Sequence, residues 1–303
     1  MAIRAAAAGS EPEEILFENA KVSLCLLLNR HSHTVRIFDF RAGADPTKRG
    51  YVLSIAQREG VERVFTVVER DEVSVWSRLG FDKEGTIPGF FKRSDAYVLG
   101  TTVPNVLAGD TAPPPSHEAL NPEAFEAAAE KVYQEAKRIA KDLPAPSPRA
   151  VRLQPSAQAI TKKAVAAATR AGRALTRFDP FGRRDVERAE YHITARGGWS
   201  LIASVERQPC FDNAFIEVLT APRNERDVGL TNAALHQLTD RLGKEGTVAC
   251  FAFSPTIDAG FAATFVANGF RRTGTLPGHL LIGGKRQGAF LWTRKLATPT
   301  DDE

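Results

Sequence analysis

Residues 226–231 bring an arginine and a glycine together at a spacing that suits a pyrophosphate. The segment is Arg226-Asp227-Val228-Gly229-Leu230-Thr231, which fits Arg/Gln-x-x-Gly-x-Gly/Ala with Thr231 in the last, small position. It lies between an expected strand, residues 214–220, and an expected amphipathic helix, residues 230–242. A turn from a strand into a helix points backbone N–H groups and the positive end of the helix dipole at one place. The segment therefore predicts an anion site, with Arg226 as its permanent charge.

A carboxylate stands in the strand that leads into this segment. Glu217 interrupts the apolar run Phe215-Ile216-Glu217-Val218-Leu219. Because an alkylamine is mostly protonated at neutral pH, a carboxylate beside the anion site could take a proton from a reacting amine. A glutamate on an alternating strand could equally face solvent. The sequence leaves both interpretations open.

One phrase of the sequence occurs twice. The copies are Gly80-Phe81-x3-Gly85-Thr86-Ile87-Pro88-Gly89 and Gly269-Phe270-x3-Gly274-Thr275-Leu276-Pro277-Gly278. A helix-like run, a short apolar strand and a second helix-like run precede each copy, which predicts a duplicated supersecondary unit. We expect two α/β (α+β) lobes, residues 13–103 and 156–297. A proline-rich linker with one helix, residues 104–155, would join them, and a basic helix is expected at 158–176.

The first copy is expected to lack the anion site. Alignment of Gly60 with Gly246 places Gly43 on Gly229, with Phe40 at the arginine position and Asp45 at the small position. A carboxylate would repel a pyrophosphate, and the Pro46 that follows removes an N–H donor. The sequence predicts that only the second lobe carries the site.

The succession of elements around residues 226–231 resembles the acetyl-CoA-binding half of the Gcn5-related N-acetyltransferases (GNATs). The resemblance implies tandem GNAT-like lobes, each a mixed twisted sheet flanked by helices. It also implies that two neighbouring strands splay apart to admit the pantetheine arm of acetyl-CoA. The implied cofactor-binding residues are Leu219, Thr220, Arg226, Asp227, Val228, Gly229, Leu230 and Thr231, with a backbone N–H near Leu219 as the oxyanion donor.

Further phrases resemble the β-lysine N-acetyltransferase family, which has a degenerate first lobe. They are Ile87-Pro88-Gly89-Phe90-Phe91 with Asp95-Ala96-Tyr97, Ser254-Pro255, residues 264–270, Gly274-Thr275-Leu276, Ile282-Gly283-Gly284 and Leu291-Trp292. The linker and basic helix depart from that pattern, as does Pro277-Gly278-His279-Leu280 where the family has Asn-Asn-Thr. The resemblance implies transfer of acetyl from acetyl-CoA to a primary amine of a small amino-acid-like acceptor, β-lysine or similar, by direct attack in a ternary complex.

Glu217 and Ser254 are the catalytic candidates for such a transfer, and His279 is the substrate-facing one. Many GNAT enzymes reprotonate the thiolate with a tyrosine five residues before the Phe of Gly-Phe, where this chain has Phe265. Ser254 could substitute for that acid or cap a helix. His279 could equally be a solvated loop residue. No metal is expected, because His31 and His33 have no third ligand.

Charge is concentrated in one part of the chain. Residues 137–184 hold twelve Lys or Arg and two acids, a net charge of +10, whereas the whole chain of 303 residues has +4. This segment is either a solvated helix face or a surface for an anionic partner. Because no aromatic stacking platform is interleaved with these cations, nucleic acid is not the expected partner. The alternative function is therefore a catalytically retired scaffold that holds an acidic protein.

The remaining composition is that of a globular protein, with 43% hydrophobic and 25% charged residues. No apolar run is long enough to span a membrane, and the three scattered cysteines fit a reducing compartment. The sequence favours a cytoplasmic protein, with a homodimer as one possible assembly.

Overall fold

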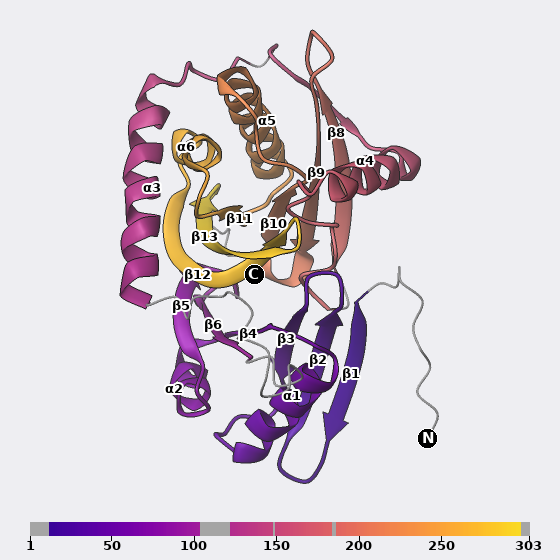
Figure 1. The fold of residues 1–303 in the computed structure, drawn as a ribbon, viewed down its shortest axis with the longest axis vertical. Coiled ribbons are helices and arrows are strands. Elements are labelled where there is room, and N and C mark those ends of the chain that lie inside the picture. Colours follow the sequence, from indigo (N-terminus) through magenta and orange to yellow (C-terminus); the bar gives the residue numbers. More distant parts are fainter. Residues whose placement is uncertain (1–11, 104–121, 148, 184–185, 298–303) are drawn as a thin grey trace, which may run out of the picture. The chain divides into compact units, whose positions relative to one another are not determined.

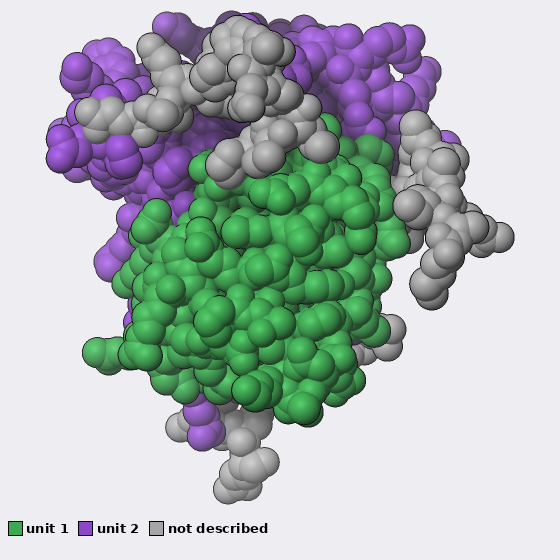
Figure 2. Space-filling model, turned by 60° about the horizontal axis from the view of Figure 1, so that its bottom comes forward, with its two compact units in different colours: residues 1–83, 98–116 green, residues 84–97, 117–303 purple. Residues whose placement is uncertain are grey.

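The computed structural model describes residues 12–103, 122–147, 149–183 and 186–297 (Figure 1). The chain forms two compact units. Unit 1 holds Met1–Lys83 and Val98–Ser116, and unit 2 holds Glu84–Tyr97 and His117–Glu303 (Figure 2). Part of the expected proline-rich linker, residues 104–121 and Pro148, lies outside the described residues.

Residues 13–102 form six strands and two helices. In chain order they are β1 (Glu13–Glu18), β2 (Ser23–Asn29), β3 (Thr34–Asp39), α1 (Pro46–Arg58), β4 (Arg63–Val68), α2 (Arg70–Arg78), β5 (Asp82–Ile87) and β6 (Ala96–Thr102). The strand order is β1-β2-β3-β4-β6-β5, and β3 and β4 are parallel. β5 and β6 carry residues of both units.

Unit 2 contains the longer series of elements. They are α3 (Pro122–Asp142), β7 (Arg152–Pro155), α4 (Gln158–Arg170), β8 (Glu187–Thr194), β9 (Ser200–Gln208), β10 (Asn213–Val218), α5 (Glu225–Lys244), β11 (Ala249–Pro255), α6 (Ala259–Ala267), β12 (Arg271–Ile282) and β13 (Lys285–Lys295). The strand order is β7-β8-β9-β10-β11-β13-β12, with β10 and β11 parallel. The expected mixed α/β architecture is confirmed.

The elements from β8 to β13 follow the same plan as those from β1 to β6. Each series runs three strands, a helix, a strand, a helix and two strands, and in each the last strand lies between the other two late strands. The repeated Gly-Phe phrase has one structural role in both. Gly80 and Gly269 have φ of +82° and +75° and end α2 and α6. The Phe81 and Phe270 amides then donate to carbonyls five residues earlier, at 3.1 and 3.0 Å.

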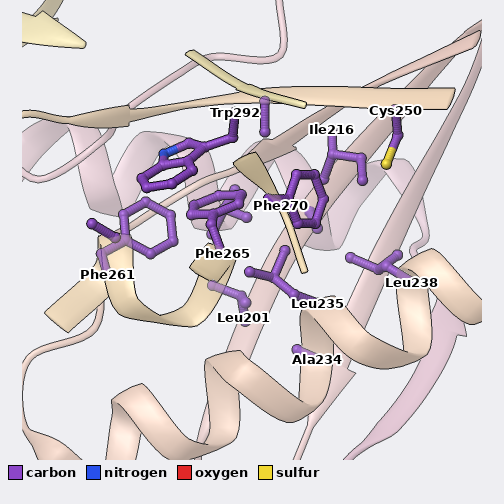
Figure 3. Packing of buried hydrophobic residues seen from close by; sticks show 14 of the residues in the cluster. Leu201, Ile216, Ala234, Leu235, Leu238, Cys250, Phe261, Phe265, Phe270 and Trp292 are labelled. Atoms are coloured by element: carbon purple, nitrogen blue, oxygen red, sulfur yellow. The ribbon is translucent and has the colours of Figure 1, made fainter. Parts of the chain in front are cut away.

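Alternation along β10 decides which side chains meet which helices. Ala214, Ile216 and Val218 belong to the core cluster that packs under α5 and α6 with Phe265 and Trp292 (Figure 3). Phe215 and Glu217 therefore face the other side of the sheet, where Phe178, from the segment after α4, packs on Ile202 and Leu219. The sheet thus has an apolar face and a face that carries polar groups.

Two helix boundaries differ from the sequence prediction. α5 begins at Glu225 rather than near Leu230, and Asn224 caps it by accepting the Asp227 amide. α4 ends at Arg170 rather than Thr176, because Gly172 takes φ +64° and closes the helix. β1, β5, β7, β8 and β12 were not expected from the sequence. Among the described residues, no helix combines the length and apolar character needed to cross a membrane.

Candidate functional site

The parallel strands β10 and β11 separate before they end. Their ladder runs from Asn213 paired with Ala249 to Ile216 paired with Ala252. β10 continues to Val218 and β11 to Pro255 without further pairing to each other. A parallel ladder that stops short leaves unpaired backbone groups on facing strands, which an extended ligand can bond. This opening lies at the carboxyl ends of the strands, where α/β sheets bind ligands.

The amino end of α5 follows β10 directly, but its amides are partly occupied. Asn224 Oδ1 accepts the Asp227 amide at 2.9 Å, and the Asn224 carbonyl accepts the Val228 amide at 3.0 Å. Residues 226–231 are thus the first turns of a helix rather than a loop. Because the amides of Val228, Gly229, Leu230 and Thr231 lie past the cap, they are in the helical hydrogen-bond register. The expected cradle of successive free amides is therefore not formed by these residues.

A pocket of about 320 Å³ lies between this helix end and the β8–β9 turn. Its lining residues are Gly197, Gly198, Trp199, Ser200, Leu201, Thr220, Ala221, Pro222, Arg223, Asn224, Arg226, Asp227 and Thr231. Thr220, Arg226, Asp227 and Thr231 were expected from the sequence to bind the cofactor. The Arg226 guanidinium donates to the Arg196 carbonyl at 2.6 Å, which holds it over the turn. The pocket thus has two arginines, Arg223 and Arg226, and one carboxylate, Asp227.

Gly229 is not required by backbone conformation or by packing. Gly229 does not have a positive φ, so its backbone conformation is open to any residue. A Cβ atom added at this position would meet no atom within 4 Å. Glycine inside a helix costs about 1 kcal/mol relative to alanine. The open space above Gly229 therefore leaves room for a ligand to approach the helix backbone closely.

Glu217 carries its carboxyl group into the polar face of the sheet. Oε1 accepts a hydrogen bond from Thr176 Oγ1. Oε2 is buried and has no hydrogen-bond partner within the described part of the chain. Burial raises the pKa of Glu217 to about 8. The hydrogen bond from Thr176 and the charge of Arg188 lower this pKa, and the negative charges of Glu206 and Asp179 raise it slightly. The carboxyl is therefore mostly neutral at pH 7 and ionises in a range that suits proton transfer.

The neighbouring carboxylate, Glu206, is fully engaged and serves structure. It accepts the Phe181 and Gly182 amides at 2.9 and 2.5 Å and pairs with Arg188 at 2.5 Å. It fixes the segment after α4 against β9, so that the wall around Glu217 is held in place. Of the two acids on this face of β9 and β10, Glu217 keeps a carboxyl oxygen available.

Ser254 does not lie beside Glu217. The ladder pairs Ile216 with Ala252, so Ser254 continues the face of Ile216 and Glu217 lies on the opposite one. Ser254 is buried, and its Oγ accepts the Trp292 indole N–H at 2.8 Å. The helix-cap interpretation of Ser254 was wrong, because Asp258 caps α6. Phe265, at the position of the missing tyrosine, stacks on Trp292 with ring centroids 5.4 Å apart (Figure 3).

His279 and Leu219 are both placed differently from expectation. His279 is buried rather than solvated, with its ring 4.5 Å from that of Phe253, on a part of β12 that skips pairing with β13. Since Phe253 follows Phe251 on the Glu217 face, His279 lies on that face too. The Leu219 amide donates to the Ile202 carbonyl at 3.0 Å. That N–H is occupied in this structure, so the Leu219 amide is not free to act as the expected oxyanion donor.

The corresponding place in unit 1 is filled by the protein's own groups. Lys48, three residues after the α1 cap Asp45, is buried with its Nζ 2.5 Å from Asp39 Oδ2, and it also donates to the Arg41 carbonyl. The Arg41 side chain bonds the Asn19 carbonyl in the β1–β2 turn at 3.1 Å. The positive charge of Arg41 thus lies near the β1–β2 turn, and the buried Lys48–Asp39 ion pair occupies the start of α1.

The caps also correct the alignment of the two copies. Asp45 and Asn224 cap equivalent helices, so Gly50 rather than Gly43 corresponds to Gly229, and Thr47 rather than Phe40 corresponds to Arg226. The error arose because α5 has 20 residues and α1 has 13, so an alignment from the helix ends shifts the helix starts.

No family model matches the chain, and no curated protein matches its sequence. Solved structures that match part of the chain include N-acetyltransferases. The ribosomal-protein-S18-alanine N-acetyltransferase of Escherichia coli matches with a TM-score of 0.38 and 16% identity, over 50% of this chain and 98% of that chain. Spermidine N-acetyltransferase of Vibrio cholerae, in complex with CoA and spermine, matches with a TM-score of 0.40 and 10% identity, over 49% and 97%.

Sequence reasoning missed Thr176 and Arg196. Thr176 was assigned to the last position of the expected helix 158–176, and the Gly172 that ends this helix earlier was the available signal. Arg196 lies in a turn marked by Gly197-Gly198, which indicated a hairpin. In the described residues no group of three or more His, Cys, Asp or Glu is placed to hold a metal ion.

Proposed function

We propose that this protein is a GNAT-type N-acetyltransferase that takes acetyl-CoA in unit 2 and transfers acetyl to a primary amine of a small acceptor. The separated ends of β10 and β11, beside the arginine-bearing pocket at the start of α5, carry this proposal. An extended pantetheine arm would lie in the strand opening, and the phosphates would meet Arg226 and Arg223. Gly229 would allow the cofactor to approach the helix closely.

Ternary-complex transfer gives Glu217 its role. The amine nitrogen attacks the thioester carbonyl, the C–S bond breaks, and the thiolate leaves with the electron pair. The ionised form of Glu217 takes the proton that the nitrogen loses. Burial raises the pKa of Glu217 toward that of the acceptor amine, which favours proton transfer from the amine to Glu217. Holding the amine and acetyl-CoA together in one complex supplies much of the remaining acceleration.

The acceptor we propose is an amino-acid-like amine, with β-lysine as the first candidate. The sequence resemblance at residues 87–97 and 264–270 supports it. Unit 1 would be a degenerate copy of the catalytic lobe. The shared order of elements supports the duplication, and the Lys48–Asp39 pair supports the loss of its anion site. In this proposal the enzyme is cytoplasmic and uses no metal.

A scaffold function is the second candidate, and the surface of α4 favours it. Residues 156–178 contain no acid, and their five cations are all exposed: Lys162, Lys163, Arg170, Arg173 and Arg177. An acidic protein would find complementary charge there.

Acetyl transfer measured by release of free thiol separates the two functions. The acceptors to test first are β-lysine, lysine and polyamines. We expect Glu217→Gln to reduce kcat/KM by a factor on the order of 10²–10⁴. Glu135→Gln, an exposed carboxylate of α3, is the control and should leave the rate unchanged. Acetyl-CoA binding without transfer to any amine would favour the scaffold.

A further inference from the structure

Thr176 fixes which oxygen of Glu217 can take a proton. Its Oγ1 accepts the Phe178 amide at 2.8 Å. A hydroxyl group has one proton, and Thr176 donates that proton to Glu217 Oε1 while the Phe178 amide bonds to a lone pair of Oγ1. Oε1 is therefore an acceptor in both charge states of the carboxyl group. The titrating proton belongs on Oε2.

Two polar atoms near this point have no hydrogen-bond partner among the described residues. Ser204 lies directly opposite Glu217 in the β9–β10 ladder, so the two side chains share a face and neighbour each other. Ser204 is buried, and neither its Oγ nor Glu217 Oε2 has a hydrogen-bond partner anywhere in the described chain. A buried polar group without a partner costs about 1–3 kcal/mol and calls for an explanation. A ligand with N–H groups would satisfy both atoms.

Several elements surround these atoms. The Leu175 amide donates to the Leu219 carbonyl at 2.9 Å, which ties the segment after α4 to the end of β10. The charged groups facing Glu217 are Arg188 of β8, Glu206 of β9 and Asp179 of the segment after α4. His279 of β12 lies on the same face, against Phe253.

We propose that Glu217 Oε2 and Ser204 Oγ form the subsite for the acceptor's primary amine, and that Thr176 is the positioning residue that reserves Oε2 for it. This inference rests on the proposed acetyl transfer. In the reaction the nitrogen forms its bond to the acetyl carbon, the carbon–sulfur bond breaks, and the proton of the nitrogen passes to Oε2. Ser204 Oγ accepts a second N–H and orients the nitrogen lone pair.

The principal test compares Thr176→Val and Thr176→Ser. Valine keeps the shape but removes the donor to the carboxylate, so the pKa of Glu217 should rise. The acid limb of the kcat/KM–pH profile should move up by about one pH unit. Serine retains the hydroxyl and should restore the wild-type profile. A Thr176→Val enzyme that loses activity equally at every pH, or a serine variant that fails to restore it, would overturn the positioning role.

A spectroscopic titration tests the contact without turnover. The infrared C=O band of protonated Glu217, assigned as the band lost in Glu217→Gln, should lose intensity with a midpoint that moves upward in Thr176→Val. An unmoved midpoint refutes the contact. If the midpoint moves but the wild-type protein transfers acetyl to no amine, the proposed function fails and the subsite has no amine to hold.

Ser204→Ala tests the second half of the subsite. It should raise KM for the amine by about fivefold and leave the pH profile unchanged. Thermal unfolding of each variant shows whether it is folded at the assay temperature. A folded Ser204→Ala protein with unchanged KM would remove Ser204 from the subsite.

Discussion

Glu217 is a carboxyl group whose ionisation is opposed by its surroundings. Its folded pKa is about 8, because burial outweighs the stabilising contacts with Thr176 and Arg188. In an unfolded chain a glutamate has a pKa near 4.5. The neutral form therefore stabilises the fold fully below pH 4.5, and that contribution is lost as the pH rises through 8.

Stability as a function of pH should reveal this residue. We expect the melting temperature of Glu217→Gln to exceed that of the wild-type protein by an amount that grows from pH 5 to pH 9, because glutamine stays neutral. Each unit of pKa displacement corresponds to about 1.4 kcal/mol. Thermal unfolding across this range measures the difference, with Glu135→Gln as the exposed control. A constant difference at all pH values would show that the pKa of Glu217 is not raised.

At the scale of elements, the strand opening and the start of α5 make the candidate site. The alternation of β10 places Glu217 on one face and the helix-packing residues on the other. The ladder with β11 ends at Ile216, the residue before Glu217, so the strands separate beside this carboxyl group. α5 then contributes Arg226 and the open position above Gly229.

Gly229→Ala separates helix stability from ligand binding. Alanine should stabilise α5 by about 0.5–1 kcal/mol, because it is the better helix former and meets no neighbour. The added methyl group should weaken acetyl-CoA binding about tenfold, as expected for an overpacked contact of 1–3 kcal/mol. Thermal unfolding and calorimetric titration measure the two effects.

Gly50→Ala is the matched control. Gly50 lies five residues after the α1 cap, as Gly229 does after the α5 cap, and it also has open space. It should stabilise without changing acetyl-CoA affinity. Equal affinities in Gly229→Ala and wild type would remove Gly229 from the site.

Much of this arrangement could be predicted from local sequence. The Gly-Phe phrase, the position of Arg226 after a strand and the alternation around Glu217 are local patterns, and each has a counterpart in the structure. The start of α5 was missed because its first turn is polar, although Asn224 followed by Asp227 is a capping pattern. β12 was missed because it contains two glycines and a proline and is held by pairing with β13.

Contacts between distant residues could not be predicted. Thr176 and Glu217 are 41 positions apart, and only the fold of the segment after α4 brings them together. The position of Ser254 depended on the register of β11, which the sequence did not reveal.

At the scale of the whole molecule, the two series of elements share a plan but differ in how the corresponding helix end is used. In unit 1 the buried Lys48–Asp39 pair fills it, and in unit 2 the same end borders a pocket. In the proposed function, cofactor binding therefore belongs to unit 2, and the pair in unit 1 has a structural role.

Asp39→Asn tests that role. Removing one partner leaves the Lys48 charge buried, which should destabilise unit 1 by about 3 kcal/mol or more. Acetyl-CoA affinity of the folded variant should stay unchanged. Asp240→Asn, at an exposed pair of α5, is the control for loss of one carboxylate. A loss of affinity in Asp39→Asn without loss of stability would contradict the assignment.

Calorimetric titration of acetyl-CoA into wild-type protein, Arg226→Glu and Lys244→Glu tests the central claim most directly. Both variants change the charge equally, but Lys244 lies at the far end of α5, about 27 Å from Arg226 at 1.5 Å per residue. We expect binding in the wild type and in Lys244→Glu, and a loss of about 100-fold or more in Arg226→Glu, since an arginine–phosphate contact is a charged hydrogen bond. No binding by the wild type, or equal binding by all three proteins, would contradict a cofactor site in unit 2.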